Sequence, residues 1–462
     1  MSSSALLLIL LILSSFAYYT GRRRAFAAAG KAAGSRRLHS RPTYYGMLTA
    51  IWCGLPALLL FGFWLAFQPK IITGLVVADL PEEIRNLPEA RRNLVVNDIK
   101  NLVEGNIVSG EVNPTMQSAA DHYRSLEATG KASLAVSVIA VAIIGMVIVN
   151  AKITPTLRAR NIVERVLEYI LIGCSTIAIF TTIGIVLSVL YEAIRFFHAI
   201  PVSDFLFGLQ WSPQTAIRAD QVGSSGAFGA VPVFLGTALI SAIAMLVAVP
   251  IGLMSAIYLS EYAGNKLRTV AKPLIEILAG IPTVVYGFFA ALTIAPFIRD
   301  IGSVLGLDVS SESALAAGLV MGIMIIPFVS SLSDDFINAV PQSLRDGSYS
   351  LGATKSETIK QVVLPAALPG IVGGILLAVS RAIGETMIVV MAAGLAANLT
   401  LNPLKTVTTV TVQIVTLLIG DQEFDSPKTL AAFALGLLLF VVTLMLNVIA
   451  LHVVRKYREQ YE

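Results

Sequence analysis

Charged residues are scarce in this chain of 462 residues. Asp, Glu, Lys and Arg make up 13% of the sequence, whereas soluble domains carry about 25%. The mean hydropathy is +0.78, and 56% of the residues are hydrophobic. This balance argues against an ordinary water-soluble domain and predicts a membrane protein.

Cysteine and histidine are also rare. Cys53 and Cys174 both lie inside apolar runs, which excludes a disulfide framework and a cysteine-based metal site. The four histidines are scattered and predict no metal site: His39, His122, His198 and His452. The basic residues flank apolar segments instead of forming one basic domain, so nucleic-acid binding is a poor explanation.

A phosphate-cradling nucleotide loop is missing. No Gly-x-x-x-x-Gly-Lys-Ser/Thr occurs, because Gly30-Lys31 is followed by Ala32 and position 25 is not glycine. No nucleophile–histidine–acid set is evident either. The sequence therefore predicts no catalytic residues and no cofactor bound by this chain, and any ATP hydrolysis must come from a separate ATPase subunit.

Long apolar runs, by contrast, are abundant. A membrane-spanning helix needs about 20 apolar residues, and backbone groups in lipid must satisfy one another, which favours helices. We predict an all-α polytopic bundle with nine spans: 3–20, 45–67, 132–151, 166–197, 231–259, 274–297, 313–333, 366–397 and 429–454. The first run is expected to be retained, because its arginines follow it, whereas a cleaved signal has its charges first.

The distribution of Lys and Arg predicts the orientation. Segments 20–44 and 152–165, the loop with Lys266, and the C-terminal tail are basic, so we place them in the cytoplasm. Loops 198–230, 298–312 and 398–428 are poor in Lys and Arg. Nine spans then put the N-terminus outside and the C-terminus inside.

We predict two parts. Residues 1–150 form a three-span extension with an external, mostly helical segment at 69–131, and residues 151–462 form a six-span core. No repeat indicates an inverted-repeat transporter.

The cytoplasmic segment 334–365 contains the first candidate motif. Its polar helical stretch is broken at Gly352, and a second short helix is expected to stop at Leu364-Pro365. This pattern predicts a helix–turn–helix, and an amphipathic helix pair suits docking into a groove of another protein. An ordinary solvated loop is the alternative.

The second motif is Ser380-Arg381-Ala382-Ile383-Gly384-Glu385-Thr386-Met387. Arg381 and Glu385 are four residues apart, so within one helix they would share a face. A charge in the bilayer costs about 2.5–3.5 kcal/mol on insertion scales, which favours a functional position. Arg381 could bind an oxyanion through its planar donors, and Glu385 would fix that arginine. The alternative is a structural ion pair.

A third feature is the pair Gly280 and Pro282 in an apolar run. It predicts a kink or an interrupted helix whose freed backbone groups face protein or water. Close helix packing on the glycine is the alternative. Glu276, one turn earlier, is expected to be an interfacial charge.

Together these segments resemble the PstC-type permease subunits of phosphate ABC importers. Residues 346–365 have the spacing of the EAA loop of ABC-importer permeases, although Asp346-Gly347-Ser348 replaces the opening Glu-Ala-Ala and Val362 replaces Ile. Thr386-Met387 favours the PstC type over its PstA-type partner. Further resemblances are 280–289 (GIPTVVYGFF), 228–232 (FGAVP) with Gly236-Thr237, and 433–436 (FALG). The resemblance covers about 160–462 and not 1–150.

The resemblance implies a type I ABC importer permease in the bacterial inner membrane. Its substrate path would include Ser380, Arg381, Glu385 and Thr386, and its ATPase-coupling loop would include Asp346, Gly352, Leu364 and Pro365. It implies a PstA-type second permease, an ATPase dimer carrying ATP and Mg, a periplasmic phosphate-binding protein, phosphate, and a sensor kinase system as partners.

Two other functions stay open at this point. One is a permease for a different oxyanion, such as phosphonate, molybdate or sulfate. The other is a membrane regulatory subunit of phosphate signalling that uses 69–131 as a sensor. A docking surface or packing collar is the simpler interpretation of that segment.

Overall fold

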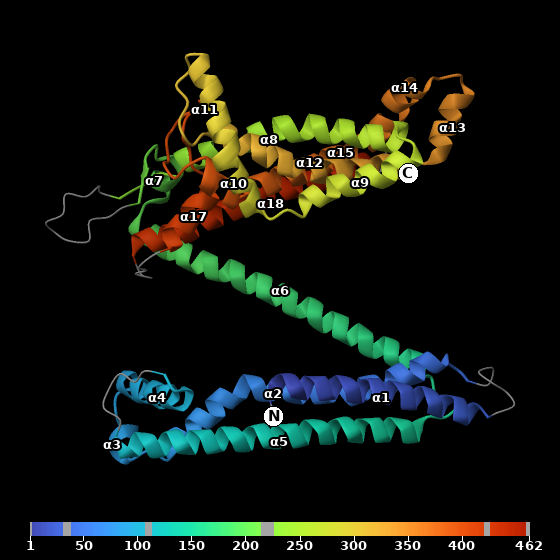
Figure 1. The fold of residues 1–462 in the computed structure, drawn as a ribbon, viewed down its shortest axis with the longest axis vertical. Coiled ribbons are helices and arrows are strands. Elements are labelled where there is room, and N and C mark those ends of the chain that lie inside the picture. Colours follow the sequence, from blue (N-terminus) through green and yellow to red (C-terminus); the bar gives the residue numbers. More distant parts are fainter. Residues whose placement is uncertain (1, 31–37, 107–112, 214–225, 420–425, 459–462) are drawn as a thin grey trace. The chain divides into compact units, whose positions relative to one another are not determined.

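The computed structural model describes residues 2–30, 38–106, 113–213, 226–419 and 426–458. Within these residues nine helices are long and apolar enough to cross a membrane, which agrees with the predicted number and with the all-α class. The chain divides into two compact units, Met1–Phe180 and Thr181–Glu462 (Figure 1).

The first unit is built on three long helices, α1 (Ser3–Ala29), α2 (Pro42–Ala78) and α5 (Pro114–Lys152). They lie side by side (Figure 1). Small residues permit the close approach: a Cβ on Gly21 would lie 2.2 Å from the Thr49 hydroxyl oxygen. Such contacts are typical of helix pairs in membranes.

The segment predicted to be external and helical contains α3 (Glu82–Arg85) and α4 (Glu89–Glu104). Ile99 of α4 is buried with Ile72 and Val76 of α2. Arg124 of α5 donates to the Leu102 carbonyl at 2.8 Å, at the end of α4. The helical prediction is therefore confirmed, and α2 and α5 extend beyond the predicted spans 45–67 and 132–151.

Helix α6 (Ala159–Ala199) begins in the first unit and ends in the second. Its first turns pack Ala159 and Val163 against Tyr45. At its other end, Phe196 packs against Phe205 and Phe228 with ring centroids 5.4 and 5.6 Å away.

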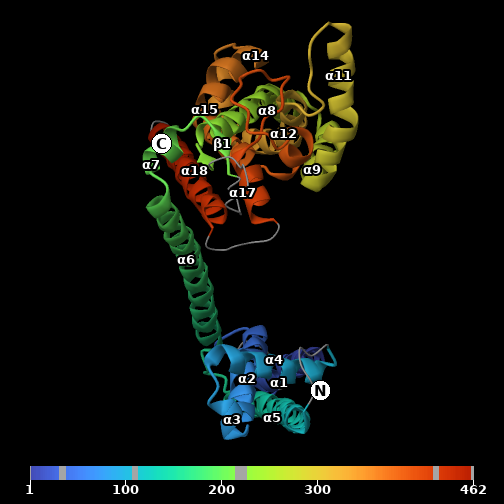
Figure 2. The same ribbon diagram turned by 90° about the vertical axis from the view of Figure 1, so that its left-hand side faces the viewer.

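The second unit is centred on α12 (Ala314–Ala339), the most buried of the nine candidate spans. Figure 2 shows α8 (Val231–Ile257) and α15 (Leu364–Ile383) beside it. Gly318 and Gly322 of α12 face α8 so closely that added Cβ atoms would touch Ile243 and Val247. The remaining elements of this unit are α7 (Val202–Phe207), β1 (Trp211–Ser212), β2 (Ala227–Phe228), η2 (Tyr258–Tyr262), α9 (Asn265–Ala279), α10 (Thr283–Phe289), η3 (Ala290–Ile294), α11 (Ala295–Val304), α13 (Gln342–Ser350), α14 (Lys355–Thr358), η4 (Ile359–Val363), α16 (Met387–Ala392), α17 (Val410–Leu418) and α18 (Pro427–Arg458).

The chain is interrupted at Gly280 and Pro282, as one of the two sequence hypotheses predicted. Helix α9 ends at Ala279 and α10 begins at Thr283, so the predicted span 274–297 is wrong as one helix. Proline supplies no N–H to continue α9. The Tyr286 hydroxyl donates to the Leu278 carbonyl at 2.8 Å, which satisfies one backbone group near the break.

Candidate substrate path and coupling site

Arg381 lies in the last turn of α15 with an exposed side chain. Its guanidinium carbon is 5.6 Å from the ring centroid of Phe328 on α12, within range of a cation–π contact. Across the described ranges, the guanidinium has no ion-pair or hydrogen-bond partner. Its N–H donors are therefore available to an anion.

Glu385 does not lie on a helical face with Arg381. Helix α15 ends at Ile383, and Gly384 is its C-terminal cap residue. The predicted span 366–397 is thus wrong as one helix, because the chain leaves the helix at Gly384. The argument that four-residue spacing puts both charges on one face fails for the same reason.

The Glu385 carboxylate instead caps the following helix. Its Oε1 accepts the N–H of Met387 at 3.1 Å and of Ile388 at 3.4 Å, at the start of α16. The prediction that Glu385 fixes Arg381 is therefore wrong in this structure, because backbone N–H groups hold the carboxylate.

The two other predicted path residues border the same junction. Ser380 is half-buried near the end of α15, and Thr386 is the N-terminal cap residue of α16. The Thr386 hydroxyl donates to the Gly384 carbonyl at 3.5 Å. Neither hydroxyl bonds to Arg381 in the described structure, and the junction is held by hydrogen bonds between side chains and backbone groups.

A buried polar network that the sequence analysis missed supports this junction. The Thr411 hydroxyl of α17 donates to the Glu385 carbonyl at 2.8 Å. Gln413 donates to the Leu395 carbonyl at 2.9 Å and accepts the indole N–H of Trp211 at 2.8 Å. The signal was present in the sequence, since Thr and Gln interrupt the apolar segment 406–418.

The predicted helix–turn–helix is confirmed at 342–358. Helix α13 ends at Ser350, and Gly352 has φ = +86°, a value that suits glycine. Thr354 and Glu357 form a capping box at the start of α14. Asp346 is exposed on α13 and accepts the Gln342 amide at 3.0 Å.

The second helix does not stop at Leu364-Pro365, as the sequence analysis predicted. Helical structure continues from α14 through the π-helical turn η4 into α15, which places Pro365 in the first turn of α15. Proline lacks an N–H and crowds the carbonyl four residues earlier. A widened π turn before it accommodates both effects.

Arg345 anchors α13 and was missed from the sequence. It is 9% exposed, and its guanidinium donates to the carbonyls of Val340 at 2.6 Å and Ile337 at 2.8 Å. It also donates to the Glu261 carboxylate of η2 at 3.0 Å. The helix–turn–helix that begins with α13 is therefore held by one nearly buried arginine.

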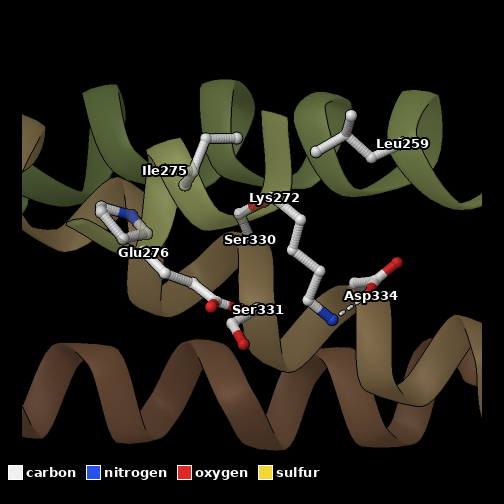
Figure 3. A pocket seen from close by; sticks show the side chains of 8 residues that line it. Leu259, Lys272, Ile275, Glu276, Ser330, Ser331 and Asp334 are labelled. Carbon is white, nitrogen blue, oxygen red and sulfur yellow. Dashed lines mark hydrogen bonds and ion pairs between the residues drawn. The ribbon is translucent and has the colours of Figure 1, made fainter. Parts of the chain in front are cut away.

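Asp334 forms a second anchor near the end of α12. It is 3% exposed, and it accepts from Arg268 at 3.2 Å and Lys272 at 2.7 Å, both on α9. This hydrogen bond raises the pKa of Lys272 above its ordinary value. Figure 3 shows Lys272 reaching Asp334 across a small pocket that Glu276 also lines. Glu276 is exposed, on α9.

The described residues contain no group of three or more His, Cys, Asp or Glu that could hold a metal ion. The two sites are made of charged side chains, ion pairs and backbone groups. One lies at the α15–α16 junction, and the other spans α13 and its anchors.

Two family models match the chain. Residues 248–459 match the binding-protein-dependent transport system inner membrane component. Residues 7–181 match a model described as a phosphate ATP-binding cassette transporter.

Individual relatives are more specific. A probable ABC transporter permease protein, YqgH, of Bacillus subtilis is 32% identical over 278 residues, which are 60% of this chain and 86% of the relative. The phosphate transport system permease protein PstC of Mesorhizobium japonicum is 33% identical, over 53% of this chain and 76% of the relative. PstC 1 of Mycobacterium tuberculosis is 32% identical, over 54% and 81%.

The chain belongs to the PstC-type family of ABC importer permeases.

This multi-pass permease carries both candidate sites inside the residues that match the inner membrane component, 248–459. The sequence resemblance left out 1–150, but the second family model covers most of that part. A chain of a bacterial alginate ABC transporter also matches, at 16% identity over 65% of this chain and 97% of that chain, with a TM-score of 0.45.

Proposed function

We propose that this permease forms half of the pore of an ATP-driven phosphate importer and that Arg381 contacts the anion in transit. The observation that carries the proposal is the unpaired guanidinium at the end of α15. A charge in a membrane-spanning segment is costly and normally has a partner or a function, and Arg381 lies in the candidate span Lys355–Ile383. Phosphate supplies the missing negative charge and accepts from the planar N–H donors of arginine.

The names of the relatives support phosphate as the anion. Those in Mesorhizobium japonicum and Mycobacterium tuberculosis are phosphate transport permeases. Phosphonate, molybdate and sulfate share the oxyanion chemistry and are the competing substrates.

Glu385 has a different role from the one that its spacing indicated. Its carboxylate holds the first N–H groups of α16, and its carbonyl is held by Thr411. We assign it to positioning the junction next to Arg381. Ser380 and Thr386 border the same path.

The coupling role belongs to α13 and the turn at Gly352. Asp346 is exposed and open to contact by a partner, while Gly352, Leu364 and Pro365 shape the connection back to α15. A dimeric ATPase would bind ATP and Mg and hydrolyse the nucleotide. Its closure would move α13, and the Arg345 anchor would pass that movement to η2 and α12.

The remaining partners follow from the importer assignment. In the inner membrane, a PstA-type permease would complete the pore. A periplasmic phosphate-binding protein would deliver phosphate to its outer mouth. The basic loops favour an external N-terminus and a cytoplasmic C-terminus. A sensor kinase system as partner stays a prediction from the resemblance.

Uptake by the assembled importer in proteoliposomes tests the substrate. Labelled phosphate should accumulate in the vesicles only when ATP is present inside them, on the side of the ATPase. Excess unlabelled phosphate should abolish the accumulation of label. Equal excesses of phosphonate, molybdate and sulfate should leave most of it. Stronger competition by one of those anions than by phosphate would contradict the phosphate assignment.

A further inference from the structure

An apolar groove lies within the first unit, where α2 and α5 meet the start of α6. It has a volume of about 280 Å³ and is partly open to the surface. Its lining consists of apolar residues and one lysine: Leu48, Trp52, Gly145, Ile148, Val149, Lys152, Leu157 and Ile162.

The absence of a side chain at Gly145 helps to form this groove. A Cβ there would lie 2.1 Å from the Trp52 carbonyl oxygen. Because Gly145 has no side chain, the backbones of α2 and α5 can lie in direct contact at this point. The rim stays open, because Trp52 is 45% exposed and Ile148 is 48% exposed. No described side chain fills the space between them.

Lys152 gives this groove a charged end. It is the last residue of α5, it is exposed, and it has no ion-pair partner in the described part of the chain. On the other side of α5, Arg23 and Arg24 line a shallow hollow with Asn150. They too lack acidic partners there.

This end of the unit therefore carries uncompensated positive charge beside an apolar surface. The sequence 20–44 contains no Asp or Glu. Arg160 is the contrasting case, because it pairs with Glu164 at 2.6 Å. Basic residues at the ends of membrane helices attract anionic headgroups, and basic pockets between such helices bind them.

We propose that this groove binds an anionic phospholipid, with one acyl chain along the α2–α5 wall and the phosphate at Lys152. The apolar lining excludes a polar occupant and suits a hydrocarbon chain. The unpaired lysine at the helix end favours an anionic headgroup over a zwitterionic one. The proposal does not depend on which anion the permease transports.

Lipid retention by the full-length chain tests the proposal. The chain is purified from nanodiscs that contain equal phosphatidylglycerol and phosphatidylethanolamine, and bound lipid is counted by native mass spectrometry. The wild type should retain phosphatidylglycerol preferentially. Lys152→Gln should lower that retention about fivefold, Lys152→Glu should lower it further, and retention of phosphatidylethanolamine should change little.

Two further variants sharpen the test. Lys70→Gln removes an exposed lysine from the distant part of α2 and should behave as the wild type. Ile148→Trp fills the groove and should lower retention of both lipids. Equal retention of the two lipids by the wild type, or equal behaviour of the Lys152 and Lys70 variants, would overturn the proposal.

A protein occupant gives a different result. If the assembled importer retains no lipid there and Ile148→Trp lowers recovery of its other subunits, the groove is a subunit interface and the proposal is wrong. Thermal unfolding of each variant in detergent shows whether it remains folded. The lysine variants alter an exposed side chain and should remain folded. Their lipid retention therefore still tests the proposal if Ile148→Trp is unstable.

Discussion

Arg345 and Glu261 form an ion pair, Nη2 to Oε1 at 3.0 Å, between α13 and η2. Their side chains are only 11% and 10% exposed. The pair joins the proposed coupling loop to the membrane core.

Removing one partner should be more damaging than removing both. Arg345→Met leaves Glu261 buried without its cation, and losses of about 3–5 kcal/mol are typical when a buried pair is broken. The double variant with Glu261→Leu should recover part of that loss. Thermal unfolding in detergent measures the stability of each variant, and the amount of ATPase that copurifies measures assembly. If the effects of the two single changes simply added in the double variant, the two side chains would not be energetically coupled.

Asp334→Asn should loosen α9 from α12. The change weakens charge-assisted hydrogen bonds to Lys272 and Arg268, with an expected loss of about 1.5–3 kcal/mol. Asp335→Asn is the matched control, because Asp335 is exposed and lies 3.9 Å from Lys272. Equal unfolding temperatures for the two variants would refute the anchor.

The same anchor has a pH dependence. The folded-state pKa of Lys272 is raised by its bond to Asp334, so its stabilising contribution is fully present below the ordinary lysine value of 10.5. It is lost as the pH rises through the folded-state pKa. The difference in unfolding temperature between wild type and Asp334→Asn should therefore be constant at pH 8–10 and shrink above that range.

Much of the fold could be predicted from the sequence, because hydropathy and helix breakers act locally. Nine spans, the break at Gly280 and the turn at Gly352 all follow from short segments. The end of α15 could not, since Gly384 lies within the predicted span 366–397 and apolar residues on both sides of the motif favour a continuous helix. Arg345 and Glu261 are 84 positions apart, and residue spacing does not encode such a contact.

Glu385 gives a prediction that separates capping from ion pairing. Glu385→Gln keeps a side-chain oxygen for the N–H groups of Met387 and Ile388, whereas Glu385→Ala loses the cap at a cost of about 1 kcal/mol. The Gln variant should retain most phosphate uptake and the Ala variant should lose more. Equal losses would show that the charge matters and the cap does not.

Gly352→Ala should strain the coupling turn. Its φ of +86° is unfavourable for alanine by about 1–2 kcal/mol. Gly347→Ala is the control, since that glycine lies within α13 with open space around its Cβ position, and alanine there should stabilise the helix by about 0.5–1 kcal/mol. ATP-driven uptake and ATPase binding should fall for the first variant only.

Arg381 is the centre of the functional account, and uptake of labelled phosphate by its variants tests it most directly. Proteoliposomes with the assembled importer would compare Arg381→Ala with Arg299→Ala, which removes another exposed arginine of the same unit. We predict that Arg381→Ala reduces the uptake rate at least tenfold with normal assembly, while Arg299→Ala stays near the wild-type rate. Wild-type uptake by a correctly assembled Arg381→Ala importer would contradict the account.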